Sequence, residues 1–155
     1  MIRWGTLTVR QGAGRIILLT LLLFSSEGFS STERIGLVKT LEPSATIVRK
    51  GVEVSLKVGS EIYEGDTILT DSDGTIGITF SDGSMLTAGS SSKVIIDNYL
   101  FNLTEKKLTF LSQVLKGSVT FMSGAINKLA PGSVRFKTPT ATLGLRGTKI
   151  IIEVD

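Results

Sequence analysis

The chain contains short segments in which apolar and polar residues alternate. Each segment ends in a turn of glycine, aspartate or serine, and this pattern limits the fold classes open to the chain. From residue 67 the pattern is regular, with strands predicted at 67–70, 75–80 and 84–87. Alternation with a period of two is typical of half-buried strands. Asp82-Gly83 is a strong hairpin signal, because glycine supplies the positive φ that tight hairpin turns need. The chain is therefore predicted to be all-β, with a hairpin across residues 81–83.

The rest of the chain after residue 30 is also predicted to consist of strands and connections, with no long helix. Residues 35–41 and 45–49 flank a proline turn, which predicts a first hairpin. Residues 107–115 fit a helical stripe as well as a strand, and the strand is favoured because the neighbouring segments are strands. Residues 98–106 are predicted to be a polar connection, and 124–132 a turn-rich connection that could hold a short helix. The remaining strands are predicted at 52–56, 94–97, 119–121, 134–137 and 150–154, of which the first and the last alternate as half-buried strands do.

The first thirty residues differ from the rest. Three arginines precede an apolar run at 16–24, and small and polar residues follow it. This is the pattern of a secretory signal peptide. The run has about half of the roughly 20 residues that a membrane-spanning helix needs. We predict a signal peptide over 1–30 with cleavage near Gly28 or Ser30, and a single domain over 31–155 without a membrane span, in the periplasm. N-terminal anchoring in the inner membrane and secretion are the alternatives.

The sequence lacks two residue types, which limits the kinds of catalytic and metal site that it can contain. The 155 residues include no cysteine and no histidine. Disulfides, thiol nucleophiles and thiolate metal sites are thereby excluded, and so is the most frequent general base and metal ligand. Residues 31–155 carry 14 basic and 13 acidic side chains. This near balance, without a basic stripe interleaved with aromatic residues, argues against a nucleic-acid partner.

The acidic turns contain the carboxylates that could carry chemistry. Asp71 and Asp73 resemble the opening of a calcium loop, but the later ligands of such a loop are missing, and a plain β-turn is favoured. Asp66 with Asp71, or Asp73 with Asp82, could in principle form the carboxylate pair of a glycosidase, yet all four lie in turn contexts. A serine paired with Lys93 is formally possible, but the chain has no histidine base, and serine in a loop after glycine is ordinary turn chemistry. We predict no catalytic residue, no metal site, no cofactor and no enzyme activity.

Arg146 is the best binding candidate among the single residues. It lies between Gly144 and Gly147, where flexible backbone flanks a guanidinium suited to carboxylates, phosphates or backbone carbonyls. The alternative is that this arginine ties two turns together.

Three segments follow one another in a specific order: GDTILT at 65–70, FSDGSMLT at 80–87, and KTPTAT at 137–142 running into RGT at 146–148. Together they resemble the FecR domain over roughly residues 35–154. The motif residues, which are also the candidate interaction residues, are Gly65, Asp66, Asp82, Gly83, Thr138, Pro139, Arg146, Gly147 and Thr148.

The resemblance implies a periplasmic all-β domain of short twisted strands and hairpins in a solenoid-like or sandwich-like stack. In that family the domain takes part in signal transduction, relaying occupancy of an outer-membrane transporter to a cytoplasmic sigma factor. The expected function is a binding or scaffolding module for protein–protein interaction in the cell envelope, with another envelope protein as partner. The alternative is a module that binds cell-wall glycan or another carbohydrate, for which exposed Tyr99 and Phe101 would be the stacking platforms.

Overall fold

The computed structural model describes residues 33–155, which form twelve strands and one helix of five residues. The prediction of an all-β chain with a short helix is confirmed. The predicted signal peptide lies outside the described residues. In chain order the elements are β1 Arg34–Glu42, β2 Ala45–Arg49, β3 Val52–Ser55, β4 Glu61–Tyr63, β5 Thr67–Thr70, β6 Thr75–Phe80, β7 Met85–Ala88, β8 Lys93–Asn102, β9 Lys107–Met122, α1 Ala125–Leu129, β10 Val134–Lys137, β11 Thr142–Gly144 and β12 Lys149–Val154.

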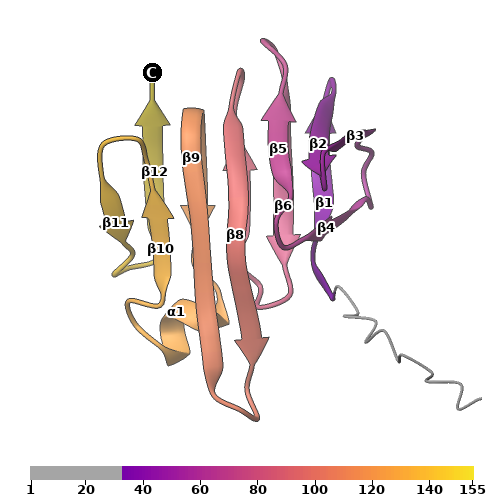
Figure 1. Ribbon diagram of the computed structural model, residues 1–155. Coiled ribbons are helices and arrows are strands. Elements are labelled where there is room, and N and C mark those ends of the chain that lie inside the picture. Colours follow the sequence, from indigo (N-terminus) through magenta and orange to yellow (C-terminus); the bar gives the residue numbers. More distant parts are fainter. Residues whose placement is uncertain (1–32) are drawn as a thin grey trace, which may run out of the picture. The chain divides into compact units, whose positions relative to one another are not determined.

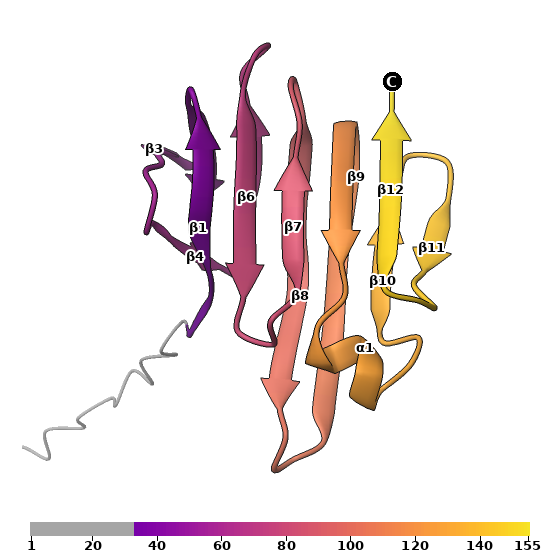
Figure 2. The same ribbon diagram turned by 180° about the vertical axis from the view of Figure 1, so that it is seen from behind.

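The strands lie in two facing layers that share the long strand β9. In one layer the strand order is β3-β2-β5-β8-β9-β10-β11, which is seen in front in Figure 1. In the other layer the order is β4-β1-β6-β7-β9-β12, which is seen in front in Figure 2. All neighbours are antiparallel except β9 and β10. The predicted stack is therefore of the sandwich-like kind.

Strand β9 passes from one layer to the other at Gly117. Phe110 and Val114 in its first half are buried, and so are Val119 and Phe121 in its second half. The buried positions are even-numbered in the first half and odd-numbered in the second half. The alternation of buried and exposed side chains therefore shifts by one residue within the strand. Gly117 has a φ of +84°, a left-handed value that glycine adopts without steric cost. The backbone bend at Gly117 is what lets one strand serve both sheets.

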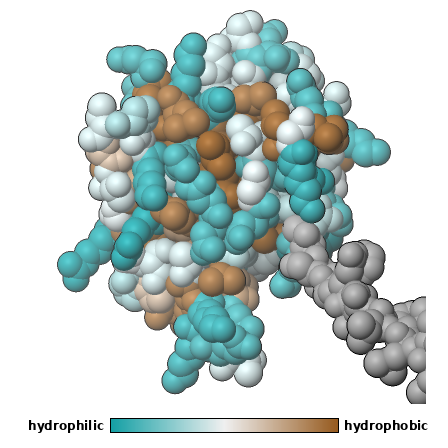
Figure 3. Space-filling view, in the orientation of Figure 1, coloured by the Kyte–Doolittle hydropathy of each residue, from teal (hydrophilic) through white to brown (hydrophobic). Residues whose placement is uncertain are grey.

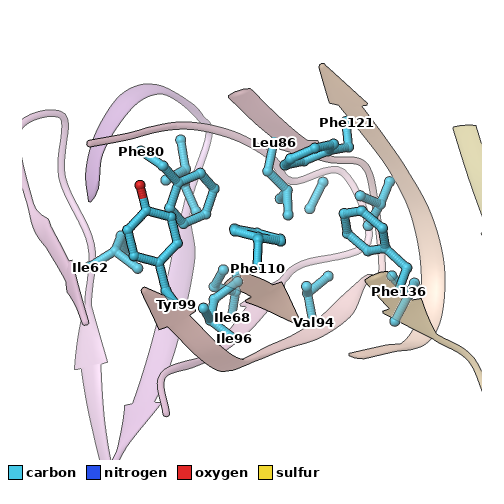
Figure 4. Packing of buried hydrophobic residues seen from close by; sticks show 14 of the residues in the cluster. Ile62, Ile68, Phe80, Leu86, Val94, Ile96, Tyr99, Phe110, Phe121 and Phe136 are labelled. Carbon is cyan, nitrogen blue, oxygen red and sulfur yellow. The ribbon is translucent and has the colours of Figure 1, made fainter. Parts of the chain in front are cut away.

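An aromatic cluster fills the space between the layers (Figure 4). Phe110 lies at its centre, with ring centroids 4.9 Å from Phe80, 5.0 Å from Phe121, 5.7 Å from Tyr99 and 5.8 Å from Phe136. Phe80 comes from β6 in one layer, whereas Tyr99 and Phe136 come from β8 and β10 in the other. Such ring pairs are favourable beyond the area that they bury. The cluster therefore holds the two layers together.

The predicted first hairpin is wrong. Residues 35–41 and 45–49 are strands, but β1 pairs with β4 and β6, whereas β2 pairs with β3 and β5. The connection at residues 43–44 carries the chain from one layer to the other. Val38 and Ile47 are both buried, each 1 % exposed. Each strand covers the core from its own side, so burial and not local pairing decides their arrangement.

Several other local predictions are confirmed, and two need correction. β6 and β7 form the hairpin across residues 81–83, residues 107–115 are a strand, and α1 lies within 124–132. Residues 98–102, predicted to be a polar connection, continue β8 instead. The strand at 52–55 is present but is not half-buried, because β3 is an edge strand whose four residues are all exposed.

No helix within residues 33–155 has the length and apolar character that crossing a membrane requires.

Candidate functional site

Asp66 lies at the centre of a charged cluster where β4 turns into β5. Its side chain is fully buried and accepts two hydrogen bonds from Arg49, Nε to Oδ1 and Nη2 to Oδ2, each 2.7 Å long. The backbone N–H of Tyr63 donates to Asp66 Oδ2 at 2.9 Å. Gly65, with a φ of +85°, forms the turn that brings Asp66 inward. The buried carboxylate is therefore paired with a bidentate cation, the geometry that makes such pairs strong.

Arg49 is held on three sides. Its guanidinium lies 4.4 Å from the centroid of the Tyr63 ring, and its Nη2 also donates to the carbonyl of Glu61 at 3.0 Å. The hydrogen bonds to Asp66 raise the pKa of Arg49 above its ordinary value. A hydrogen bond to the Glu61 carboxylate raises the pKa of Tyr63. Most of the donor capacity of Arg49 is thus used within the fold.

Asp82 organises a turn in the facing layer, between β6 and β7. Its Oδ1 accepts hydrogen bonds from the Ser84 hydroxyl at 2.6 Å and the Ser84 N–H at 3.1 Å, and its Oδ2 accepts from the N–H of Ile126 at 3.2 Å. The last of these bonds satisfies a free donor at the start of α1. Gly124 precedes the helix, and a Cβ there would lie 2.8 Å from Asp82 Oδ2. Asp82 therefore fixes the hairpin turn and the helix together.

Tyr99 connects Asp82 to Glu64, which precedes Asp66 by two residues. Its hydroxyl accepts a hydrogen bond from the Asp82 N–H at 2.8 Å and donates to Asp82 Oδ1 at 3.1 Å, and its backbone N–H donates to Glu64 at 2.9 Å. Burial raises the pKa of Tyr99 well above its ordinary value, and the Asp82 carboxylate adds to the shift. The interpretation of Tyr99 as an exposed stacking platform is wrong, because this side chain is only 6 % exposed. Phe101 is half-buried and packs against the core.

The segment Arg146-Gly147-Thr148 is tied to the same end of the sandwich through α1. The Gly147 carbonyl accepts hydrogen bonds from Asn127 Nδ2 at 2.8 Å and from Ser123 Oγ at 3.0 Å. The Ser123 N–H donates to the Thr148 carbonyl at 2.8 Å. The Arg146 side chain is exposed, and within residues 33–155 its guanidinium makes no hydrogen bond or ion pair. The interpretation that Arg146 ties two turns together is therefore wrong, because the backbone around it makes those contacts.

Thr138 and Pro139 lie apart from the other candidate residues. They belong to the tip between β10 and β11, where the Thr138 hydroxyl accepts from the Ala141 N–H at 3.1 Å. β10 and β11 are antiparallel, with Arg135 opposite Gly144, so the tip is at the far end of the hairpin from Arg146 (Figure 1). The structure thus links Gly65, Asp66, Asp82, Gly83, Gly147 and Thr148 by one series of contacts, and leaves Thr138 and Pro139 outside it.

Comparison with known proteins shows the family of the chain. A family model described as "FecR protein" matches residues 66–155. The chain belongs to the FecR family. A solved structure described as a "Cell surface anchoring domain" is 35% identical over 39% of this chain and 82% of its own, with a TM-score of 0.38. No curated protein matches the chain.

The FecR match begins at Asp66, so it includes β5 to β12 and leaves out β1 to β4. Arg49, the partner of the first matched residue, therefore lies in the segment before the match. Sequence reasoning missed Arg49, Tyr99 and Asn127 as members of the polar network. Arg49 lies 17 residues from Asp66 in the chain, and no local pattern indicates the pair.

The acidic turn at 71–74 is a β-turn, as interpreted from the sequence. The Gly74 N–H donates to the Asp71 carbonyl at 3.0 Å, and the Asp71 carboxylate accepts from the Ser44 hydroxyl. Over residues 33–155 there is no group of three acidic, histidine or cysteine side chains close enough to hold a metal ion.

Two shallow pockets flank the pair formed by Arg49 and Tyr63. One of about 350 Å³ is lined by Arg49, Lys50, Tyr63, Glu64 and Gly65, and one of about 280 Å³ lies on the other side of the pair, toward β3. Arg49 and Tyr63 border both pockets, and Lys50 and Glu64 add one charge of each sign to the larger one.

Proposed function

We propose that this FecR-family chain is a non-catalytic binding or scaffolding module that contacts another protein of the cell envelope. The observation that carries the proposal is how the family segments use their polar residues. Asp66 and Asp82 are both buried and are occupied by donors from within the fold. Carboxylates so occupied stabilise turns and do not need a substrate, whereas Arg146 remains exposed for contact with a partner.

The compartment belongs to the same proposal. A chain with an N-terminal signal pattern would work in the periplasm, anchored to the inner membrane or secreted, and the lack of cysteine is compatible with an oxidising compartment. A role in signal transduction fits the family and is the finer form of the proposal.

The glycan alternative receives less support. Stacking on a sugar requires an exposed aromatic face. Of the aromatic residues between 33 and 155, Phe80, Tyr99, Phe110, Phe121 and Phe136 are buried. Tyr63 is half-exposed, but Arg49 covers one face of its ring.

In-cell crosslinking tests the interaction. A photoreactive residue placed at Arg146 in the tagged protein, and in a control at Lys39 on β1, would be activated in intact cells before the periplasm and outer membrane are fractionated. We expect one reproducible envelope-protein adduct from position 146 that is weak or missing from position 39. Recovery of the protein without any specific adduct from either position would contradict the proposal.

A further inference from the structure

Acidic and basic residues are strongly segregated along the sequence, although the net charge of residues 31–155 is close to zero. Residues 33–105 carry 11 acidic and 6 basic side chains, whereas residues 106–152 carry 8 basic side chains and no acidic one. The eight cations are Lys106, Lys107, Lys116, Lys128, Arg135, Lys137, Arg146 and Lys149. All eight are exposed, and only Lys107 forms an ion pair within residues 33–155, with Glu105. Most of this positive charge is therefore available to a partner.

The fold gathers part of this charge at one margin of the sandwich. β11 is an edge strand, because within the described part of the chain it pairs only with β10. Arg135 and Lys137 are exposed on β10, directly opposite Gly144 and Thr142 of β11, and Arg146 follows β11 by two residues. We call Arg135, Lys137 and Arg146 the basic edge. Figure 3 shows hydrophilic side chains projecting from the side of the molecule where β10 and β11 lie in Figure 1.

Thr142 and Gly144, the β11 residues that lie opposite the basic side chains of β10, leave the basic edge open. Gly144 has no side chain, and a Cβ built there would meet no atom within 4 Å. An edge strand also presents backbone N–H and C=O groups that can pair with an added strand. Because side chains of a strand repeat every two residues, a strand laid along β11 places alternate side chains on the same face as Arg135 and Lys137. Backbone pairing and charge pairing can thus occur together.

We propose that the partner binds through an extended acidic segment that adds to β11 and pairs its carboxylates with the basic edge. This inference rests on the proposed function and names the chemistry of the partner. A protein segment is favoured over a glycan because no aromatic residue of the described chain is fully exposed on this margin to stack on a sugar. It is favoured over a lipid surface because the residues of β11 that face outward, Thr142 and Gly144, offer no apolar side chain to insert.

A peptide titration tests the proposal. The probe is a short fluorescent peptide of alternating glutamate and valine, compared with the same peptide carrying glutamine for glutamate, by fluorescence anisotropy at low and high salt. We expect the glutamate peptide to bind at least about tenfold more tightly than the glutamine peptide and to lose this advantage in salt. The double variant Arg135→Glu, Lys137→Glu is expected to weaken binding by at least about tenfold.

The matched control is Lys39→Glu, Lys57→Glu, which makes the same change of charge at two exposed lysines on β1 and before the β4 strand. It is expected to change the affinity by less than about twofold. Equal binding of the two peptides, or equal loss in the two double variants, would overturn the proposal. So would binding of phosphatidylglycerol vesicles or of an acidic polysaccharide in place of the peptide.

Hydrogen exchange of the unaltered protein gives a second readout that does not depend on any variant. The amides of Thr142–Gly144 are expected to become protected when the glutamate peptide is present, and no protection there would exclude strand addition.

In-cell crosslinking distinguishes failure of the basic edge as the binding site from failure of the proposed function. If the Arg135→Glu, Lys137→Glu variant still yields the wild-type adduct, the proposed function stands and the basic edge is not its site. If the wild-type protein yields no adduct, the proposed function itself fails.

Discussion

The pair formed by Arg49 and Asp66 shows how a single residue outside the family segment controls one inside it. Asp66 is fully buried, and the two hydrogen bonds from Arg49 pair its carboxylate with a cation. Removing one partner of a buried pair leaves an uncompensated charge, which costs more than the pair itself contributes. The first turn of the family segment therefore depends on a residue of β2.

Replacing Arg49 by methionine is expected to lower the free energy of unfolding by roughly 3 kcal/mol, because Asp66 stays buried without its cation. The measurement is urea unfolding near neutral pH. Arg34→Met is the matched control, because Arg34 and Glu61 are exposed and 3.5 Å apart. Its expected effect is below about 0.5 kcal/mol. Similar losses in both variants would contradict the structural role of the buried pair.

Tyr99 predicts a dependence of stability on alkaline pH. Its pKa is raised in the folded protein, chiefly by burial, so the folded state favours the protonated phenol. The resulting stabilisation is complete below the ordinary tyrosine pKa of about 10 and is lost as the pH rises through the higher folded value. In Tyr99→Phe the titrating group is gone, and Asp82 also loses its two hydrogen bonds with the Tyr99 hydroxyl, at a cost of roughly 1–3 kcal/mol near neutral pH.

Urea unfolding of both proteins from neutral to strongly alkaline pH measures this effect. The difference in the free energy of unfolding between wild type and Tyr99→Phe is expected to shrink above pH of about 10. A difference that stays constant over this range would mean that Tyr99 does not titrate with folding.

Among the elements, β9 carries the most demanding local geometry, at Gly117. A Cβ on this residue would lie 2.6 Å from Ser92 Cα, and the left-handed φ is itself unfavourable for other residues. We expect Gly117→Ala to lower the free energy of unfolding by more than about 2 kcal/mol. Gly132 has almost the same φ, +85°, with open space where the Cβ would be. Gly132→Ala is therefore the control, with an expected loss of about 1 kcal/mol, and equal losses in thermal or urea unfolding would show that crowding by Ser92 is unimportant.

The sequence predicted those elements whose signal is local. The β6–β7 hairpin follows from alternation and an Asp-Gly turn, which are contained in a dozen neighbouring residues. The pairing of β1 was missed, because its neighbours β4 and β6 are chosen by the shared core and not by the turn that follows it. Tyr99 was missed because the register of β8 shifts between Ile96 and Asn98, so that an even-numbered inward pattern becomes odd. The turn residues of the candidate site were identified from the sequence. Their partners Arg49 and Asn127 were missed because they come from elements that are distant in the chain.

At the scale of the whole molecule, the shared strand predicts how the protein unfolds. β9 hydrogen-bonds to β8 and β10 in its first half and to β7 and β12 in its second half. Its amides are expected to exchange with solvent only through global unfolding, with similar protection in both halves, while β3 and β11 exchange faster. Hydrogen exchange followed by mass spectrometry or NMR checks this. Distinct free energies of opening for the two halves of β9 would instead indicate layers that unfold independently.

In a sandwich in which one strand belongs to both layers, the two layers are covalently continuous along that strand. Two sheets that meet only through side chains can slide past each other or separate. Here the backbone of β9 continues from one layer into the other. We expect a force applied at one margin either to displace both layers together or to stay within the edge strands. The continuous backbone of β9 therefore joins the two layers into one unit.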